Sequence, residues 1–129
     1  MKTKLTAILI LAASATSAQV PDVGQGLYSQ HCASCHGAAA DGAGPMAPFL
    51  TVPSPRLDDL AARNEGKFPM LDVIHVIDGR TGLRGHGGEM PVFGALFTAD
   101  AGRMETYGSV IETRGRIMSI ALFLESIQN

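Results

Sequence analysis

Apolar residues recur at three- and four-residue steps in four stretches of the chain, which is the spacing of an amphipathic helix. The longest stretch covers residues 109–128, and shorter ones cover residues 23–35, 57–63 and 69–78. No β-branched runs alternate with these stretches, as they would in a chain that builds a parallel sheet. The pattern therefore predicts an all-α fold.

The stretch at residues 109–128 predicts the longest helix. Its periodic apolar positions are Val110, Ile117, Ile120, Ala121, Leu124 and Ile127. Ser109 and Glu112 fit a capping box at the start of this helix. Gly115 weakens the pattern, so a start nearer Arg116 is the alternative.

Gly24 lies inside the first predicted helix, where a glycine costs about 1 kcal/mol relative to alanine. Because glycine has no side chain, a second helix can approach closely at this position. Phe123 of the last helix is well placed to pack on Gly24 and Tyr28. We therefore expect the N- and C-terminal helices to pack together.

Two loops are predicted between the helices. Residues 37–55 are punctuated by glycine and proline throughout, which excludes a helix or a central strand. A loop of this length in a small domain is usually functional. Residues 81–94 are glycine-rich again and contain Met90 followed by Pro91.

The N-terminus has the three-part layout of a secretory signal peptide. Lys2 and Lys4 precede an apolar run over residues 5–13, and small residues follow at 14–18. The run is about half of the ~20 residues that a membrane span needs. We expect cleavage after Ala18, with Ala15 as the alternative, so that residues 1–18 are a signal peptide and residues 19–129 are the mature domain.

Charge limits the partners of the mature chain. The full sequence has 10 basic and 12 acidic residues. Removal of Lys2 and Lys4 with the leader leaves eight basic residues against twelve acidic ones, a net charge of −4. No basic stripe is available to neutralise phosphates, so nucleic-acid binding is not expected. We also expect no integral membrane segment in the mature chain.

The only two cysteines form the pattern Cys-x-x-Cys-His, made by Cys32, Cys35 and His36. Near one turn of helix both thiols point to the same side, so each can add to a vinyl group of one porphyrin. His36 then lies under the ring with a nitrogen available to the iron. The pattern predicts one haem c, attached covalently through Cys32 and Cys35. A core built from few aromatic residues, 5% with no tryptophan, would depend on such a cofactor.

Three other interpretations of the cysteine pair are weaker. A thioredoxin-like redox pair requires a βαβ context, which the pattern lacks. A structural zinc site requires further ligands, and no second Cys-x-x-Cys is present. A plain surface disulfide would leave His36 unexplained.

Met90 is the expected second axial ligand, because a methionine on an irregular loop is unusual and a thioether is a soft iron ligand. His86 in the same loop is the alternative. His75 is expected at the surface. The remaining methionines are expected to pack or to lie on the wrong side of the haem: Met46, Met70, Met104 and Met118. The carbonyl of Pro45 is a candidate to bind the other ring nitrogen of His36 and fix its tautomer.

With these residues in view, the chain resembles the class I cytochromes c over nearly its whole mature length. The matching features, in order, are the pair Gly24 and Tyr28, residues 32–37, residues 42–45, residues 77–79, the pair Met90 and Pro91, and the pair Phe123 and Leu124. The resemblance implies a cytochrome c fold in which the terminal helices pack together around one haem. It also implies His36 and Met90 as the axial ligands.

These features predict a periplasmic electron-transfer protein that is not an enzyme. Its iron would cycle between Fe(III) and Fe(II) in brief, charge-steered contacts with redox partner proteins. A haem subunit of a periplasmic dehydrogenase or reductase is the first alternative, motivated by the long segments 81–89 and 98–113. An open-site haem enzyme or gas sensor is the second, and it requires that Met90 is not bound.

Overall fold

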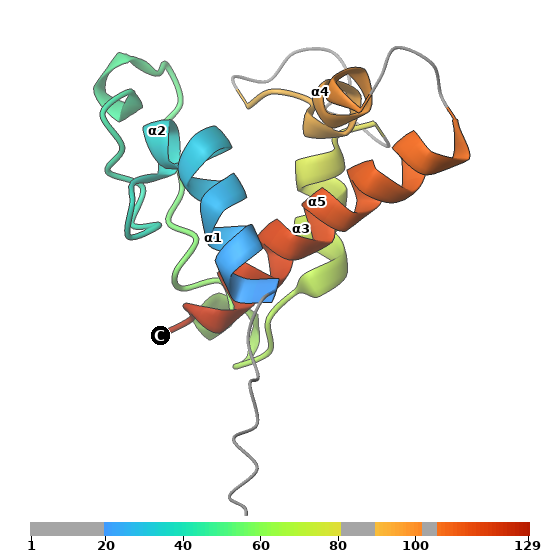
Figure 1. Ribbon diagram of the computed structural model, residues 1–129. Coiled ribbons are helices and arrows are strands. Elements are labelled where there is room, and N and C mark those ends of the chain that lie inside the picture. The colour runs from blue at the N-terminus through green and yellow to red at the C-terminus, as the bar shows by residue number, and fades with distance from the viewer. Residues whose placement is uncertain (1–19, 81–89, 102–105) are drawn as a thin grey trace, which may run out of the picture.

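The computed structural model describes residues 20–80, 90–101 and 106–129, and within these ranges all regular structure is helical (Figure 1). The α-helices are α1 (Val20–His31), α2 (Ala33–His36), α3 (Met70–Asp78), α4 (Phe93–Asp100) and α5 (Tyr107–Ser126). Two 3₁₀ turns, η1 (Ala47–Phe49) and η2 (Ala62–Asn64), lie between α2 and α3. The predicted all-α fold is confirmed.

The first and last helices, α1 and α5, pack against each other as predicted. Gly24 makes this possible, since a Cβ there would lie 2.8 Å from the Cβ of Phe123 and would also collide with the carbonyl group of Ser119. One turn further along α1, the ring of Tyr28 lies 5.2 Å from the ring of Phe123. The missing side chain at Gly24 therefore sets the distance between the two helices.

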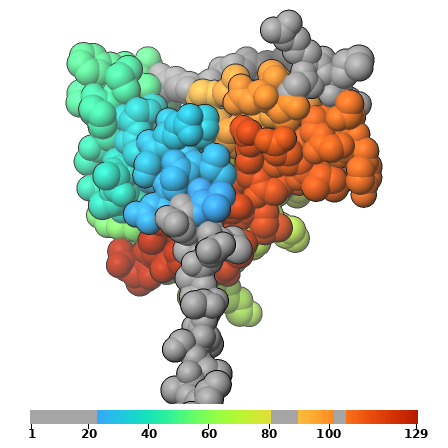
Figure 2. All heavy atoms as spheres, in the orientation of Figure 1, coloured from blue at the N-terminus to red at the C-terminus, as the bar shows by residue number. Residues whose placement is uncertain are grey.

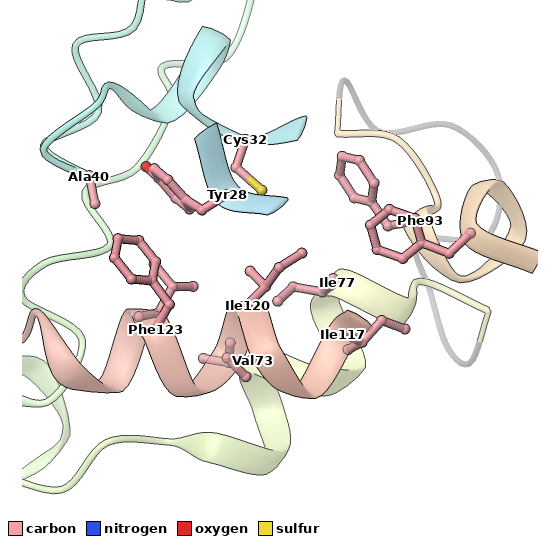
Figure 3. Packing of buried hydrophobic residues seen from close by; sticks show 12 residues of the cluster. Tyr28, Cys32, Ala40, Val73, Ile77, Phe93, Ile117, Ile120 and Phe123 are labelled. Carbon is pink, nitrogen blue, oxygen red and sulfur yellow. The ribbon is translucent and has the colours of Figure 1, made fainter. Parts of the chain in front are cut away.

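The core lies where α3 and α4 also meet α5 (Figure 3). Its buried apolar members are Tyr28, Cys32, Ala40, Val73, Ile77, Phe93, Phe97, Ile117, Ile120, Ala121, Phe123 and Leu124. From α4, the rings of Phe93 and Phe97 lie 5.6 Å apart and both contact the ring of His31 at the end of α1. The core thus joins the residue before Cys32 to the helix that follows Met90.

The predicted helix over residues 23–35 is divided into α1 and α2 by Cys32 alone. The NH group of Cys32 still donates to the carbonyl of Tyr28 at 2.8 Å, and the NH group of His36 donates to the carbonyl of Cys32 at 2.9 Å. Gly37 then ends the helical backbone with a φ of +81°. The predicted helix over residues 69–78 is confirmed as α3, which ends at Gly79 with a φ of +65°.

The prediction of an amphipathic helix over residues 57–63 is wrong. This segment forms turns that lead into η2. Within it, the NH group of Arg63 donates to the carbonyl of Asp59 at 3.1 Å, but other backbone groups bond to distant parts of the chain. The NH group of Leu57 donates to Ala40, and the carbonyl of Leu57 accepts from the side chain of Gln128. The Gln128 side chain also accepts from the NH group of Ala61.

The start of α5 differs from the prediction. Thr106 is the N-cap, with its hydroxyl accepting from the NH group of Ser109 at 3.2 Å and its NH group donating to the Ser109 hydroxyl at 3.0 Å. The capping box therefore pairs Ser109 with Thr106 and not with Glu112. Gly115 lies inside α5, where a Cβ would meet open space, so the helix does not begin near Arg116.

Helix α4 was not predicted. It occupies part of the segment between Met90 and the last helix that the sequence left without regular structure. Thr98 on α4 donates its hydroxyl to the carbonyl of Gly94 at 2.7 Å and lies 3.2 Å from the hydroxyl of Thr113 on α5. Thr113 is fully buried, so this polar contact is part of the α4–α5 interface.

Candidate functional site

The cysteine pair lies where α1 passes into α2. Cys32 is buried and Cys35 is half-buried, and both are free thiols. Burial, with a smaller contribution from Cys35, raises the pKa of the Cys32 thiol to about 12. Figure 3 shows the Cys32 sulfur directed toward the region between α1 and Phe93, with Ile77 and Ile120 beside it. One thiol of the attachment pattern therefore faces the apolar core.

The structure of the described residues also bears on the other interpretations of the cysteines. Within residues 20–80, 90–101 and 106–129, no three His, Cys, Asp or Glu side chains gather closely enough to hold a metal ion. The same ranges contain no strand that could build the βαβ context of a thioredoxin-like pair. Neither the zinc interpretation nor the redox-pair interpretation gains support from this part of the chain.

His36 is buried, and two oxygen atoms face one of its ring nitrogens. Its Nδ1 atom lies 3.0 Å from the carbonyl oxygen of Pro55 and 3.1 Å from the hydroxyl oxygen of Ser54. A carbonyl oxygen only accepts, so Nδ1 carries the ring proton and Nε2 keeps its lone pair. This is the tautomer that a metal ligand bound through Nε2 requires.

The prediction that Pro45 provides this carbonyl is wrong. The residues on both sides of Pro45 bond to the backbone of α2: the NH group of Gly44 donates to Cys35 at 3.2 Å, and that of Met46 donates to Ser34 at 2.9 Å. These bonds hold Pro45 beside the end of α2, where it is exposed. The chain then passes through η1 and returns, so that Ser54 and Pro55 are the residues at the His36 ring.

Several backbone contacts fix the returning segment against the loop after His36. The carbonyl of Ala40 accepts from the NH group of Leu57 at 2.7 Å, and the NH group of Gly42 donates to the carbonyl of His36 at 2.8 Å. Gly42 has a φ of +81°, and a Cβ there would lie 2.6 Å from the carbonyl oxygen of Ser54. A glycine at this position is therefore required for the segment to reach the ring.

Tyr28 holds the backbone on the other side of His36. Its buried hydroxyl donates to the carbonyl of Gly37 at 2.7 Å. Burial and nearby acidic groups raise the pKa of Tyr28 far above its ordinary value, so the hydroxyl stays neutral and remains a donor. Ser54 and Pro55 thus hold the ring of His36, and Tyr28 on α1 holds the backbone of the next residue, Gly37.

Met90 lies three residues before the start of α4 and is half-buried, packed on the same apolar core that includes Cys32. The alternative ligand His86 lies outside the described residues, as does Met104. His75 is exposed on α3, as predicted, and Met70 packs against the core. Met46 is exposed, and Met118 is exposed as well, so the expectation that Met118 packs in the core is wrong.

These residues fit a covalently bound haem. The free thiols have the attachment spacing, the histidine beside them has one ring nitrogen anchored, and Met90 offers a thioether at the same apolar core. The fit agrees with a comparison against known families. The family model for cytochrome c matches residues 22–107, which is more than half of the chain. The chain belongs to the cytochrome c family.

Membership in the cytochrome c family establishes the cofactor and the coarse function. The protein binds haem c covalently, through cysteines spaced as Cys32 and Cys35 are, and is a c-type cytochrome that transfers electrons. The class I form suggested by the sequence is consistent with this. No curated protein and no solved structure gives a significant match to the chain. Among the helices of the described ranges, none is both long enough and apolar enough to span a membrane.

Proposed function

We propose that this cytochrome c is a periplasmic electron carrier whose haem iron is bound by His36 and Met90. The observation that carries the proposal is the contact between His36 Nδ1 and the Pro55 carbonyl, since it leaves Nε2 as the free donor of a buried ring. Met90 supports it, because its thioether lies at the apolar core that also holds Cys32. With both axial positions filled, no substrate would bind the metal.

The bound haem supplies an iron that exchanges one electron between Fe(III) and Fe(II). The chain retains the haem through Cys32 and Cys35, and Pro55 orients His36. Phe93, Ile77 and Ile120 are buried in the apolar cluster that the Cys32 sulfur faces, so this side of the site is shielded from water. A site that excludes water and fixes its ligands needs little reorganisation when the charge on the iron changes.

The periplasmic location rests on the signal peptide at residues 1–18 and the mature domain at residues 19–129, both of which remain proposals. Residues 1–19 lie outside the described structure. Members of this family are generally exported, which supports the assignment. Mass spectrometry of the exported holoprotein would give the new N-terminus and distinguish cleavage after Ala18 from cleavage after Ala15.

An apolar surface beside Cys35 supports docking to a redox partner. Residues 42–55 contain no charged side chain, and they flank α1 and α2 at the surface (Figure 2). Met46, Phe49 and Val52 are exposed, Phe49 to 79%. We propose that this loop makes the contact itself. The net charge of −4 in the mature chain would steer a partner that presents a basic face.

Voltammetry of the purified holoprotein, combined with exposure of the reduced protein to carbon monoxide, tests the carrier proposal. A single reversible one-electron wave with slow or absent CO binding at neutral pH is expected, because Met90 fills the second axial position. Rapid CO binding would contradict this and would favour the open-site enzyme or sensor.

A second candidate is a haem subunit fixed to a periplasmic dehydrogenase or reductase. A groove of about 310 Å³ lies between α3 and α5, lined by the apolar side chains of Ile74, Ile117 and Met118 and by the polar side chains of His75, Asp78 and Arg114. Leu71 and Ile111, on the same two helices, are 71% and 51% exposed. Gel filtration of native extracts at high salt separates the two functions: a free carrier elutes as a small protein, whereas a subunit elutes with its large partner.

A further inference from the structure

Resting on the proposed role of His36 as an iron ligand, we propose that Ser54 is a positioning residue whose hydroxyl accepts a second hydrogen bond from the His36 ring and thereby lowers the reduction potential. Its hydroxyl oxygen lies 3.1 Å from Nδ1, and the Pro55 carbonyl lies 3.0 Å from the same atom. One ring NH group therefore faces two acceptors from consecutive residues.

The direction of the Ser54 hydrogen bond follows from the tautomer. Nδ1 has a single proton, and it must carry that proton if Nε2 binds iron. A protonated Nδ1 has no lone pair to offer, so the Ser54 hydroxyl accepts and does not donate in this contact. The NH group is shared between the two oxygens in a three-centre bond.

Ser54 is held in place by its neighbours on both sides. Its carbonyl lies against the backbone of Gly42, where a Cβ would not fit, and Gly42 is itself bonded to the carbonyl of His36. Leu57, three residues on, donates its NH group to Ala40. The same backbone contacts that place Pro55 therefore hold the Ser54 backbone beside the ring, and the hydroxyl reaches Nδ1 from this position.

An acceptor at Nδ1 makes the imidazole a stronger electron donor through Nε2, because the NH bond becomes more polarised. Stronger donation stabilises Fe(III) more than Fe(II), since the ferric ion carries the larger charge. When a redox partner supplies one electron, the proton stays on Nδ1 and only the strength of its two hydrogen bonds changes. The Ser54 contact therefore favours the oxidised form and lowers the potential.

Redox titration of the holoprotein tests this inference. In Ser54→Ala, the ratio of ferrous to ferric protein at a fixed ambient potential is expected to rise about threefold, an effect comparable with the net contribution of one weak hydrogen bond. At 59 mV per tenfold for a one-electron couple, this corresponds to about +30 mV. Ser29→Ala, an exposed serine on α1, is the matched control and should leave the ratio unchanged.

Ser54→Thr and Ser54→Val separate the hydroxyl from the packing, because these two side chains have nearly the same shape. The threonine variant is expected to keep the wild-type potential, and the valine variant to show the same rise as alanine. A structural role would move both equally. In the reduced wild-type protein, NMR of the His36 ring gives an independent measure, since the Nδ1 proton should move upfield in Ser54→Val and not in Ser54→Thr.

An unchanged potential in both the alanine and valine variants would overturn the inference. Equal shifts in the threonine and valine variants would overturn it as well. Either result could occur in a protein whose spectra still show ligation by His36 and Met90, so the proposed function would stand. Spectra of the wild type that lack this ligation would instead refute the proposed function.

Discussion

Phe123 on α5 lies directly against Gly24 on α1, with only 2.8 Å between the Phe123 Cβ and the position that a Cβ of residue 24 would occupy. The carbonyl of Ser119 blocks the same position, and a backbone group cannot rotate away. Gly24→Ala should therefore force α1 and α5 apart. We expect a loss of about 1–3 kcal/mol in the free energy of unfolding, the usual cost of overpacking.

Urea unfolding of the holoprotein, followed by far-UV circular dichroism, measures the effect of Gly24→Ala. Gly115→Ala is the matched control, because it lies inside α5 and its new Cβ meets open space. The control should gain up to about 1 kcal/mol from the better helix propensity of alanine. Equal effects of the two variants would show that the helices do not meet at Gly24.

Asp58 gives the protein an acid-sensitive contact. The Arg56 guanidinium bonds to both oxygens of the Asp58 carboxylate, at 3.0 and 2.6 Å, and holds the pKa of that carboxyl below its usual range. A lowered pKa in the folded state means that the stabilisation is complete above the ordinary pKa of about 3.9 and disappears as the pH falls through the folded value. Asp58→Asn should lower the urea midpoint at pH 7, and the two midpoints should converge at low pH, where the Asp58 carboxyl is protonated in the folded protein as well.

The control for Asp58→Asn is Asp59→Asn. This variant removes an exposed ion pair between Asp59 and Arg63, four residues later in the sequence. Contacts of this kind add little stability, so its midpoint should change only slightly at any pH. A pH-independent effect of Asp58→Asn would refute the assignment of the acid sensitivity to the Arg56 contact.

The mature chain made without haem is expected to be largely unfolded, because the cofactor would fill much of the interior of this small domain. Alkylation with iodoacetamide tests this. In an unfolded chain Cys32 and Cys35 react at similar rates. In the folded arrangement Cys35 would react much faster, since burial raises the pKa of Cys32 to about 12 and the thiolate is the reactive form. A large preference for Cys35 in the haem-free chain would disprove the prediction.

The sequence was most informative where one local pattern determines the structure. The periodicity of residues 69–78 predicted α3, and Gly24 with Phe123 predicted how α1 meets α5. It failed where distant segments compete for the same backbone groups. Residues 57–63 have helical periodicity, but Ala40 and Gln128 bond to the backbone groups of Leu57 and Ala61 in this segment.

The haem attachment residues could be predicted because two cysteines and a histidine are adjacent in the sequence. The partner of the His36 ring could not, because the loop after it offers prolines at 45, 48, 53 and 55 whose carbonyls have the same chemistry. Only the path of the chain through η1 selects Pro55. Ser54 carried no signal of its own, since its role depends on how the chain folds back between His36 and Pro55, which are 19 positions apart.

An absorbance scan of the ferric holoprotein in the far red tests the central claim most directly, because a methionine sulfur bound to ferric haem gives a charge-transfer band there. The account predicts this band in the wild type and in His86→Ala, and its loss in Met90→Ala. Absence of the band from the wild type, together with rapid CO binding by the reduced form, would contradict the closed electron-transfer site with His36 and Met90 as ligands.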